Sequence, residues 1–128
     1  MTYTIQQLSA AYHLPASTLR YYEQVGLLTD VERDGKHRIY TKHHFNRLGA
    51  IQCFKETGMS LKQIERFFYH EDVTNDYATL VAILSDQNQS ITDQLALLIA
   101  NQQHIEKKLA FYKEKKAAID HGDPLPNW

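Results

Sequence analysis

The chain begins with two short segments whose apolar residues recur at helical spacing. In the first, Thr4 and Gln7 have the spacing of a capping box, which predicts a helix that begins after Thr4 and ends near Tyr12. In the second, Pro15 suits the first turn of a helix, and Gly26 suits the residue that follows a helix end. Two short helices joined by about three residues form a helix-turn-helix.

Residues 29–40 lack this helical spacing. Two short runs, Val31–Arg33 and His37–Tyr40, flank an Asp34-Gly35 turn, and this arrangement predicts a small β-hairpin.

Two further helices are predicted after the hairpin. Thr41 caps the first of them and Gly58 ends it, while Ser60 and Gln63 form a second capping box that starts the next helix. The polar residues 71–76 then break the pattern, and we predict that they form a linker.

Residues 77–119 carry the longest periodic pattern in the chain. Its apolar residues alternate in steps of four and three, which favours a coiled-coil seam over a helix packed on a globular core. A helix of about 40 residues is about 60 Å long and has no equal partner within this chain, so we predict a homodimer. Asn88 and Gln102 also lie on the seam, where polar groups specify register at a cost in stability. The seam residues predicted to form the dimer interface are Leu84, Ile91, Leu95, Leu98, Ile105, Leu109 and Tyr112. Residues 120–128, which include two prolines, are predicted to form an irregular tail.

The composition favours a folded, soluble protein, with 43% hydrophobic and 23% charged residues among 128. No apolar run is long enough to span a membrane, and no secretory leader follows Met1, so we expect a cytoplasmic location and no membrane partner. Charge is unevenly divided, because residues 1–70 hold nine Lys and Arg against six acids, whereas residues 71–128 hold five against nine. Any polyanionic partner is therefore expected at the first half of the chain.

Three large side chains, Arg20, Tyr21 and Tyr22, stand side by side on the second predicted helix. Consecutive residues fan around a helix, so they cannot all face one core. In a DNA-reading helix-turn-helix the second helix enters the major groove, and its outward residues meet bases and phosphates. The residues predicted to point outward are Ser17, Thr18, Arg20 and Tyr21. The alternative is that both tyrosines are packing residues and that Arg20 pairs with Glu23, three positions later.

Several short motifs make the first 70 residues resemble the MerR family of transcription regulators. They are Thr18–Glu23, Val25–Leu28, Arg38–Tyr40 and Gly58–Leu61. The resemblance implies a mainly α fold, with a winged helix-turn-helix DNA-binding domain over residues 1–70 followed by a long coiled-coil dimerisation helix. It also implies double-stranded promoter DNA as the partner, a homodimer that distorts an overlong promoter spacer, and RNA polymerase as an indirect partner at the promoter.

The same resemblance places DNA contacts on the second helix and on the wing. The predicted contacts are Arg20, Tyr21 and Tyr22 on the helix, with Lys36, His37, Arg38 and Tyr40 on the wing. The wing departs from the pattern, because many members have Gly-Tyr-Arg at residues 36–38 and a proline after the Gly-Leu-Leu that ends at Leu28.

Cys53 is the single cysteine, so no intramolecular disulfide forms. Its surroundings, IQCFKETGMS, resemble the NmlR-like and AdhR-like branch of the family, which responds to nitric oxide and aldehydes. This resemblance implies that Cys53 senses an electrophile. Lys42, Lys55 or a nearby histidine would favour the reactive thiolate. The alternative is that Cys53 is a small buried hydrophobe.

Other functional classes find little support in the sequence. His43 and His44 point about 100° apart on a helix, and no cysteine follows residue 53, so we predict neither a metal site nor a cofactor. Paired carboxylates, a Gly-rich phosphate loop and a nucleophile motif are absent, so we do not predict an enzyme. The competing hypothesis is a coiled-coil protein-interaction module without specific DNA binding, which a weak salt dependence of DNA binding would indicate.

Overall fold

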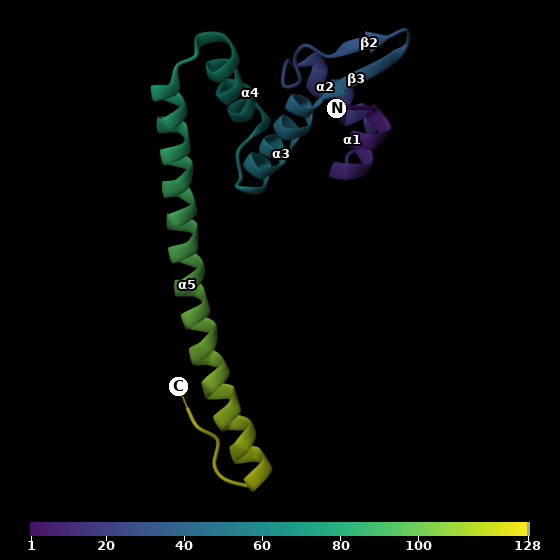
Figure 1. The fold of residues 1–128 in the computed structure, drawn as a ribbon. Coiled ribbons are helices and arrows are strands. Elements are labelled where there is room, and N and C mark those ends of the chain that lie inside the picture. The colour runs from purple at the N-terminus through teal and green to yellow at the C-terminus, as the bar shows by residue number, and fades with distance from the viewer. Residues whose placement is uncertain (128) are drawn as a thin grey trace. The chain divides into compact units, whose positions relative to one another are not determined.

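The structure is a computed structural model that describes residues 1–127, and it is mainly α-helical with one small sheet (Figure 1), as predicted. The chain divides into two compact units, Met1–Gln87 and a second that begins at Asn88. In chain order the elements are β1 (Thr2–Tyr3), α1 (Ile5–Tyr12), α2 (Ala16–Gln24), β2 (Glu32–Asp34), β3 (His37–Thr41), α3 (Lys42–Glu56), α4 (Leu61–Tyr69), the π-helical turn η1 (His70–Thr74) and α5 (Tyr77–His121). Within the described residues, no helix is both long and apolar enough to cross a membrane.

Helices α1 and α2 form the predicted helix-turn-helix. Thr4 and Gln7 make both hydrogen bonds of the capping box, which satisfies backbone groups that the start of a helix leaves free. Helix α2 ends in a Schellman motif, in which Gly26 takes a φ of 84° and the Leu27 amide donates to the Tyr22 carbonyl at 2.8 Å. The left-handed conformation at Gly26 turns the chain sharply away from α2 and toward the hairpin.

The predicted hairpin is present, with its strands shifted by one residue and a third strand beside it. The sheet has the order β1-β3-β2, so β3 is central and β1 lies at an edge. His37 pairs with Asp34, which leaves Gly35 and Lys36 as the turn instead of the predicted Asp34-Gly35. Strand β1 was not predicted, because two residues are too few to show the alternation of apolar and polar side chains that marks a strand. It is a strand only through its pairing with β3.

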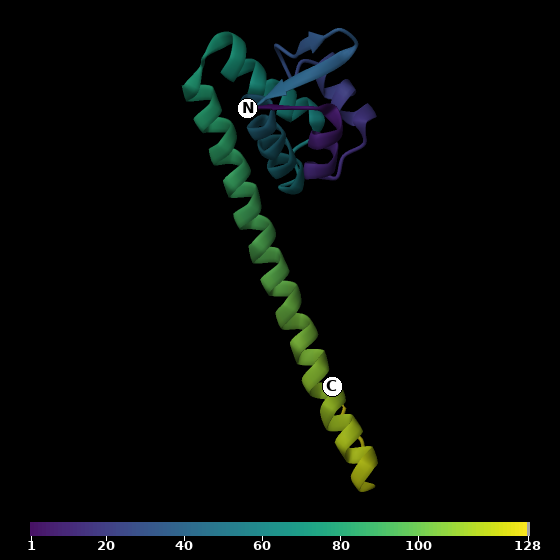
Figure 2. The same cartoon turned by 45° about the vertical axis from the view of Figure 1, so that its right-hand side comes forward.

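Helices α1 to α4 and the sheet enclose the hydrophobic core of the first unit. The largest fully buried side chains are Tyr40, Leu8, Leu19, Leu27, Leu28, Leu48, Ile51 and Ile64. Figure 2 turns the molecule so that the hairpin and the helices around it are seen from a second side. Because α2 gives its inner side to this core, its other side remains available to solvent.

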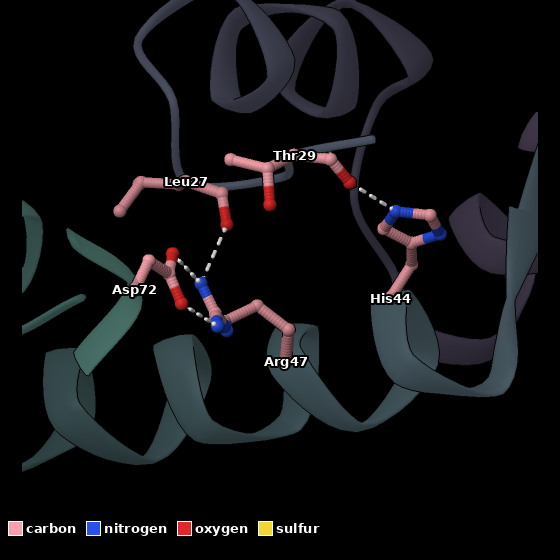
Figure 3. A network of polar contacts seen from close by, with 5 residues as sticks. All are labelled: Leu27, Thr29, His44, Arg47 and Asp72. Carbon is pink, nitrogen blue, oxygen red and sulfur yellow. Dashed lines mark hydrogen bonds and ion pairs between the residues drawn. The ribbon is translucent and has the colours of Figure 1, made fainter. Parts of the chain in front are cut away.

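A buried polar network holds the segment after α2 in place (Figure 3). Arg47 on α3 makes a bidentate ion pair with Asp72 on η1, at 2.7 and 3.0 Å, and its guanidinium also lies 4.0 Å from the centre of the Phe68 ring. His44 accepts the Thr41 amide at Nδ1, so its Nε2 carries the proton that is donated to the Thr29 carbonyl. Arg47 also donates to the Leu27 carbonyl at 3.4 Å, so two residues of α3 fasten the loop that joins α2 to the hairpin.

The first turns of α5 belong to the first unit. Leu80 is buried, and the Gln87 side chain donates to the Thr57 carbonyl at the end of α3. Farther along α5, all seven predicted seam residues are exposed in the single chain, from 40% at Ile91 to 65% at Leu98. The domain boundary at residue 70 and the dimer seam remain predictions.

Candidate nucleic-acid interface

The side chains of α2 face the core or the solvent according to the 3.6-residue period of a helix. Leu19 and Tyr22, three positions apart, are buried, whereas Arg20 and Tyr21 are exposed. Ser17 is exposed as predicted, but Thr18 is half-buried and offers less surface than expected. An exposed arginine beside an exposed tyrosine can donate hydrogen bonds to base edges and to phosphates.

Tyr22 packs against the core, and its role as a DNA contact stays a prediction. Its ring is buried in the core, and its hydroxyl accepts a hydrogen bond from the Lys55 ammonium at 3.3 Å. This contact places Lys55, an exposed cation near the end of α3, beside α2. Sequence reasoning missed Lys55 in this position because it lies 33 residues from Tyr22 and no local pattern links the two.

Three of the four predicted wing residues and one residue of α2 meet at a cleft of about 200 Å³. Arg20 on α2 and Lys36, His37 and Arg38 on the hairpin line one part of it, and the start of α1 lines the rest. Three permanent cations thus line a space next to the first turn of α1, the positive end of that helix dipole. Such a combination attracts an anion of phosphate size.

Glu23 on α2 contacts two arginines of the hairpin. Arg38 Nε donates to the Glu23 carboxylate at 2.7 Å, and Arg33 Nη2 lies 3.6 Å from its other oxygen. The alternative pairing of Glu23 with Arg20 is therefore not the arrangement in the structure, and Arg20 points to solvent. The spacing within α2 offered Arg20 as an alternative partner, but the hairpin brings two other arginines to Glu23.

Tyr40, predicted to contact DNA, is instead fully buried. It lies on the central strand β3, where β1 pairs on one side and the core covers the ring, which meets His44 edge-on. Its hydroxyl has no hydrogen-bond partner within the described residues, and burial, followed by the charge of Glu23, raises the pKa of Tyr40. Tyr40 therefore shapes the base of the wing and presents no atom to a ligand.

Comparisons with known proteins identify the family of the chain. The family model of the MerR HTH family regulatory protein matches residues 3–71, more than half of the chain. The chain belongs to the MerR family. An uncharacterised HTH-type transcriptional regulator of Haemophilus influenzae is 36% identical to it over 119 residues, which make up 91% of this chain and 88% of that protein. The regulator AdhR of Bacillus subtilis is 32% identical over 93 residues, covering 70% of this chain and 65% of AdhR.

Solved structures extend the likeness of this MerR-family chain to its full fold. The crystal structure of HiNmlR, a MerR family regulator lacking the sensor domain, bound to promoter DNA, has a TM-score of 0.77 and 35% identity. The match covers 91% of this chain and 94% of HiNmlR. The predicted resemblance to the MerR family and to its NmlR-like and AdhR-like members is confirmed, and the chain is a MerR-family transcriptional regulator.

Cys53 of this MerR-family regulator is exposed on α3. The alternative prediction of a small buried hydrophobe is therefore wrong for the single chain. The Cys53 carbonyl accepts the Thr57 amide at the end of α3, and Thr57 in turn accepts the Gln87 side chain of α5. An accessible thiol thus lies one helical turn from a contact between α3 and the start of α5.

Proposed function

We propose that this regulator binds a pseudo-palindromic promoter operator as a homodimer, with α2 in the major groove and the hairpin on the backbone. The observation that carries the proposal is the cleft where Arg20 meets Lys36, His37 and Arg38, beside the exposed Tyr21. The similar regulator HiNmlR, whose crystal structure contains bound promoter DNA, supports the proposal.

The homodimer is proposed to form through the seam of α5. The exposed aliphatic residues of that helix favour an apolar partner, and a second copy supplies the same 3.5-residue pattern. A symmetric dimer presents two recognition helices to two half-sites. Membership of the family supports a distorted, overlong promoter spacer, on which RNA polymerase engages both promoter elements. Smooth bending of such a site costs on the order of 1–6 kcal/mol, which the backbone contacts must offset.

The proposal is tested by recovering bound fragments of genomic DNA and comparing two arginine variants on the recovered operator. Arg20→Ala should weaken binding by about 1–3 kcal/mol, because a base or phosphate contact is lost. Arg66→Ala is the matched control, since Arg66 is an exposed arginine of α4 that does not line the cleft. Fluorescence anisotropy measures both affinities. Equal binding by folded Arg20→Ala and wild type would refute the assignment of α2 as recognition helix.

A second proposal concerns the signal, and the exposed Cys53 thiol supports it. We propose that the Cys53 thiolate attacks an electrophile, such as the carbonyl carbon of an aldehyde, whose oxygen then takes up a proton. An adduct there disturbs the end of α3, where Thr57 accepts Gln87, and so shifts the balance between two arrangements of the dimer on DNA.

Cys53→Ser keeps the size of the side chain and removes the nucleophile, so it serves as the test. The variant should bind the operator like wild type and should lose its transcriptional response to aldehydes or nitric-oxide donors. A full response from the serine variant would mean that the inducer acts elsewhere.

A further inference from the structure

Two arginines of the wing face each other across the hairpin. Arg33 on β2 and Arg38 on β3 are direct partners in the antiparallel register. Like charges at directly opposite positions destabilise a strand pair. The hairpin therefore needs a counter-charge at this position if the two guanidiniums are to stay together.

Glu23 supplies that counter-charge from the last turn of α2. One carboxylate oxygen accepts Arg38 Nε at 2.7 Å, and the other lies 3.6 Å from Arg33 Nη2. Within residues 1–127, these two contacts are the only ion pairs between α2 and the hairpin. The recognition helix thus carries the single acidic group that fastens the wing to it.

The pair with Arg38 is more shielded from water than an ordinary surface ion pair. The side chains of Glu23 and Arg38 are each only 22% exposed. Partial exclusion of water lowers the effective dielectric constant and strengthens the attraction. Arg33 is half exposed, so its contact with Glu23 is more easily exchanged for another anion.

We propose that Glu23 is a positioning residue for DNA recognition, which holds Arg38 and Arg33 at a set distance from the recognition helix and away from indiscriminate phosphate contacts. This inference rests on the proposed function. Phosphate contacts fix the register of a protein on DNA, and base contacts specify the sequence. When α2 holds the wing arginines, they reach the DNA phosphates only where α2 also lies in the major groove. Phosphate contacts and base contacts are therefore coupled.

Loss of the Glu23 charge should therefore affect specific and non-specific binding in different ways. Operator binding loses a pre-arranged wing, whereas non-specific binding gains cations that are free to reach any phosphate. Each new phosphate contact adds about 0.9 to the slope of log K against log salt concentration. Between 50 and 200 mM salt, a slope change of 0.9 corresponds to about a 3.5-fold change in the ratio of association constants.

The experiment compares Glu23→Gln with Glu32→Gln on two duplexes. Glu32 is an exposed acid of β2 that pairs in register with Ile39 and has no ion pair within the described residues, so its variant makes the same charge change on the hairpin itself. The duplexes are the operator recovered by wild-type protein and a scrambled sequence of equal length. Glu23→Gln should lower the ratio of operator to scrambled affinity about tenfold and steepen the scrambled-duplex slope by about 0.9 to 1.8. Glu32→Gln should leave the ratio within about twofold of wild type.

Loss of folded protein lowers both affinities equally and leaves the ratio unchanged, so the ratio separates positioning from mere stability. An equal ratio for the two variants would overturn the inference. If Glu23→Gln fails to fold by circular dichroism, Glu23→Asp replaces it, since it keeps the charge and displaces the carboxylate. Glu32→Asp is then the matched control, and the ratio of operator to scrambled affinity decides. Adding Glu23→Gln to an Arg33→Gln, Arg38→Gln background should cause no further loss, and a full further loss contradicts action through these arginines. A wild-type protein that does not prefer the operator would refute the proposed function itself, whatever the variants do.

Discussion

Replacing Asp72 by alanine would leave the Arg47 guanidinium without its counter-ion inside the first compact unit. The Arg47 side chain is only 4% exposed, and its two bonds to Asp72 are its shortest polar contacts, at 2.7 and 3.0 Å. After the substitution, the Arg47 guanidinium still donates to the Leu27 carbonyl at 3.4 Å and still lies over the Phe68 ring. Neither of these neutral partners restores the solvation that a buried cation has lost.

The size of the effect follows from the exposure of the two partners. Removing one member of a fully buried ion pair costs about 3–5 kcal/mol. The Asp72 side chain is 27% exposed, so water can enter beside it, and we expect Asp72→Ala to cost about 2–3 kcal/mol. The reverse change, Arg47→Met, leaves a carboxylate that already contacts water and should cost about 1 kcal/mol. The order of the two costs is the sharper prediction.

Thermal and urea unfolding followed by circular dichroism, at one fixed protein concentration, measures these differences. A loss of 2–3 kcal/mol corresponds to a fall in the midpoint of about 8–24 °C for a unit of this size. Asp120→Ala is the control, because Lys116 and Asp120 form an ion pair whose side chains are 80% and 55% exposed. It should cost no more than about 0.5 kcal/mol. If Asp72→Ala matched this control, or if Arg47→Met cost more than Asp72→Ala, the network would not act as a buried anchor.

Three other expectations follow from the structure. Leu98→Asp on the predicted seam should yield monomers by sedimentation, since it places a charge in a desolvated interface, and a persistent dimer would show that the seam is elsewhere. Hydrogen bonds from Thr79 lower the pKa of Asp76, so this cap stabilises α5 fully above the ordinary value of 3.8 and fades as the pH falls through the lowered pKa. The thermal midpoints of Asp76→Ala and wild type should therefore differ at pH 7 and converge as the pH falls below 3.8, and a constant difference would contradict this. Tyr40→Phe removes a buried hydroxyl that has no partner in the described residues. The variant should fold at least as stably as wild type and bind the operator with the same affinity. Weaker binding would show that the Tyr40 hydroxyl contacts DNA.

The helices and their ends could be predicted because their signals are local. Thr4 and Ser60 cap the residues that immediately follow them, and Gly26 adopts the left-handed conformation that ends α2. The same holds for the outward placement of Arg20 and Tyr21, which follows from helical period once Leu19 is assigned to the core. These inferences need only the few residues within one or two turns.

Interactions between distant segments decided the rest of the candidate site. Tyr40 is buried because β1 and the core cover it, Lys55 reaches Tyr22 across 33 positions, and Glu23 pairs with the hairpin rather than with Arg20. Cys53 is exposed although its residue type favours burial. The sequence by itself therefore determined the helices, their caps and the exposed face of α2, because those depend on backbone geometry over a few residues. Only the tertiary structure decided which charges meet and which polar groups lose water, because both depend on the surfaces that fold against them.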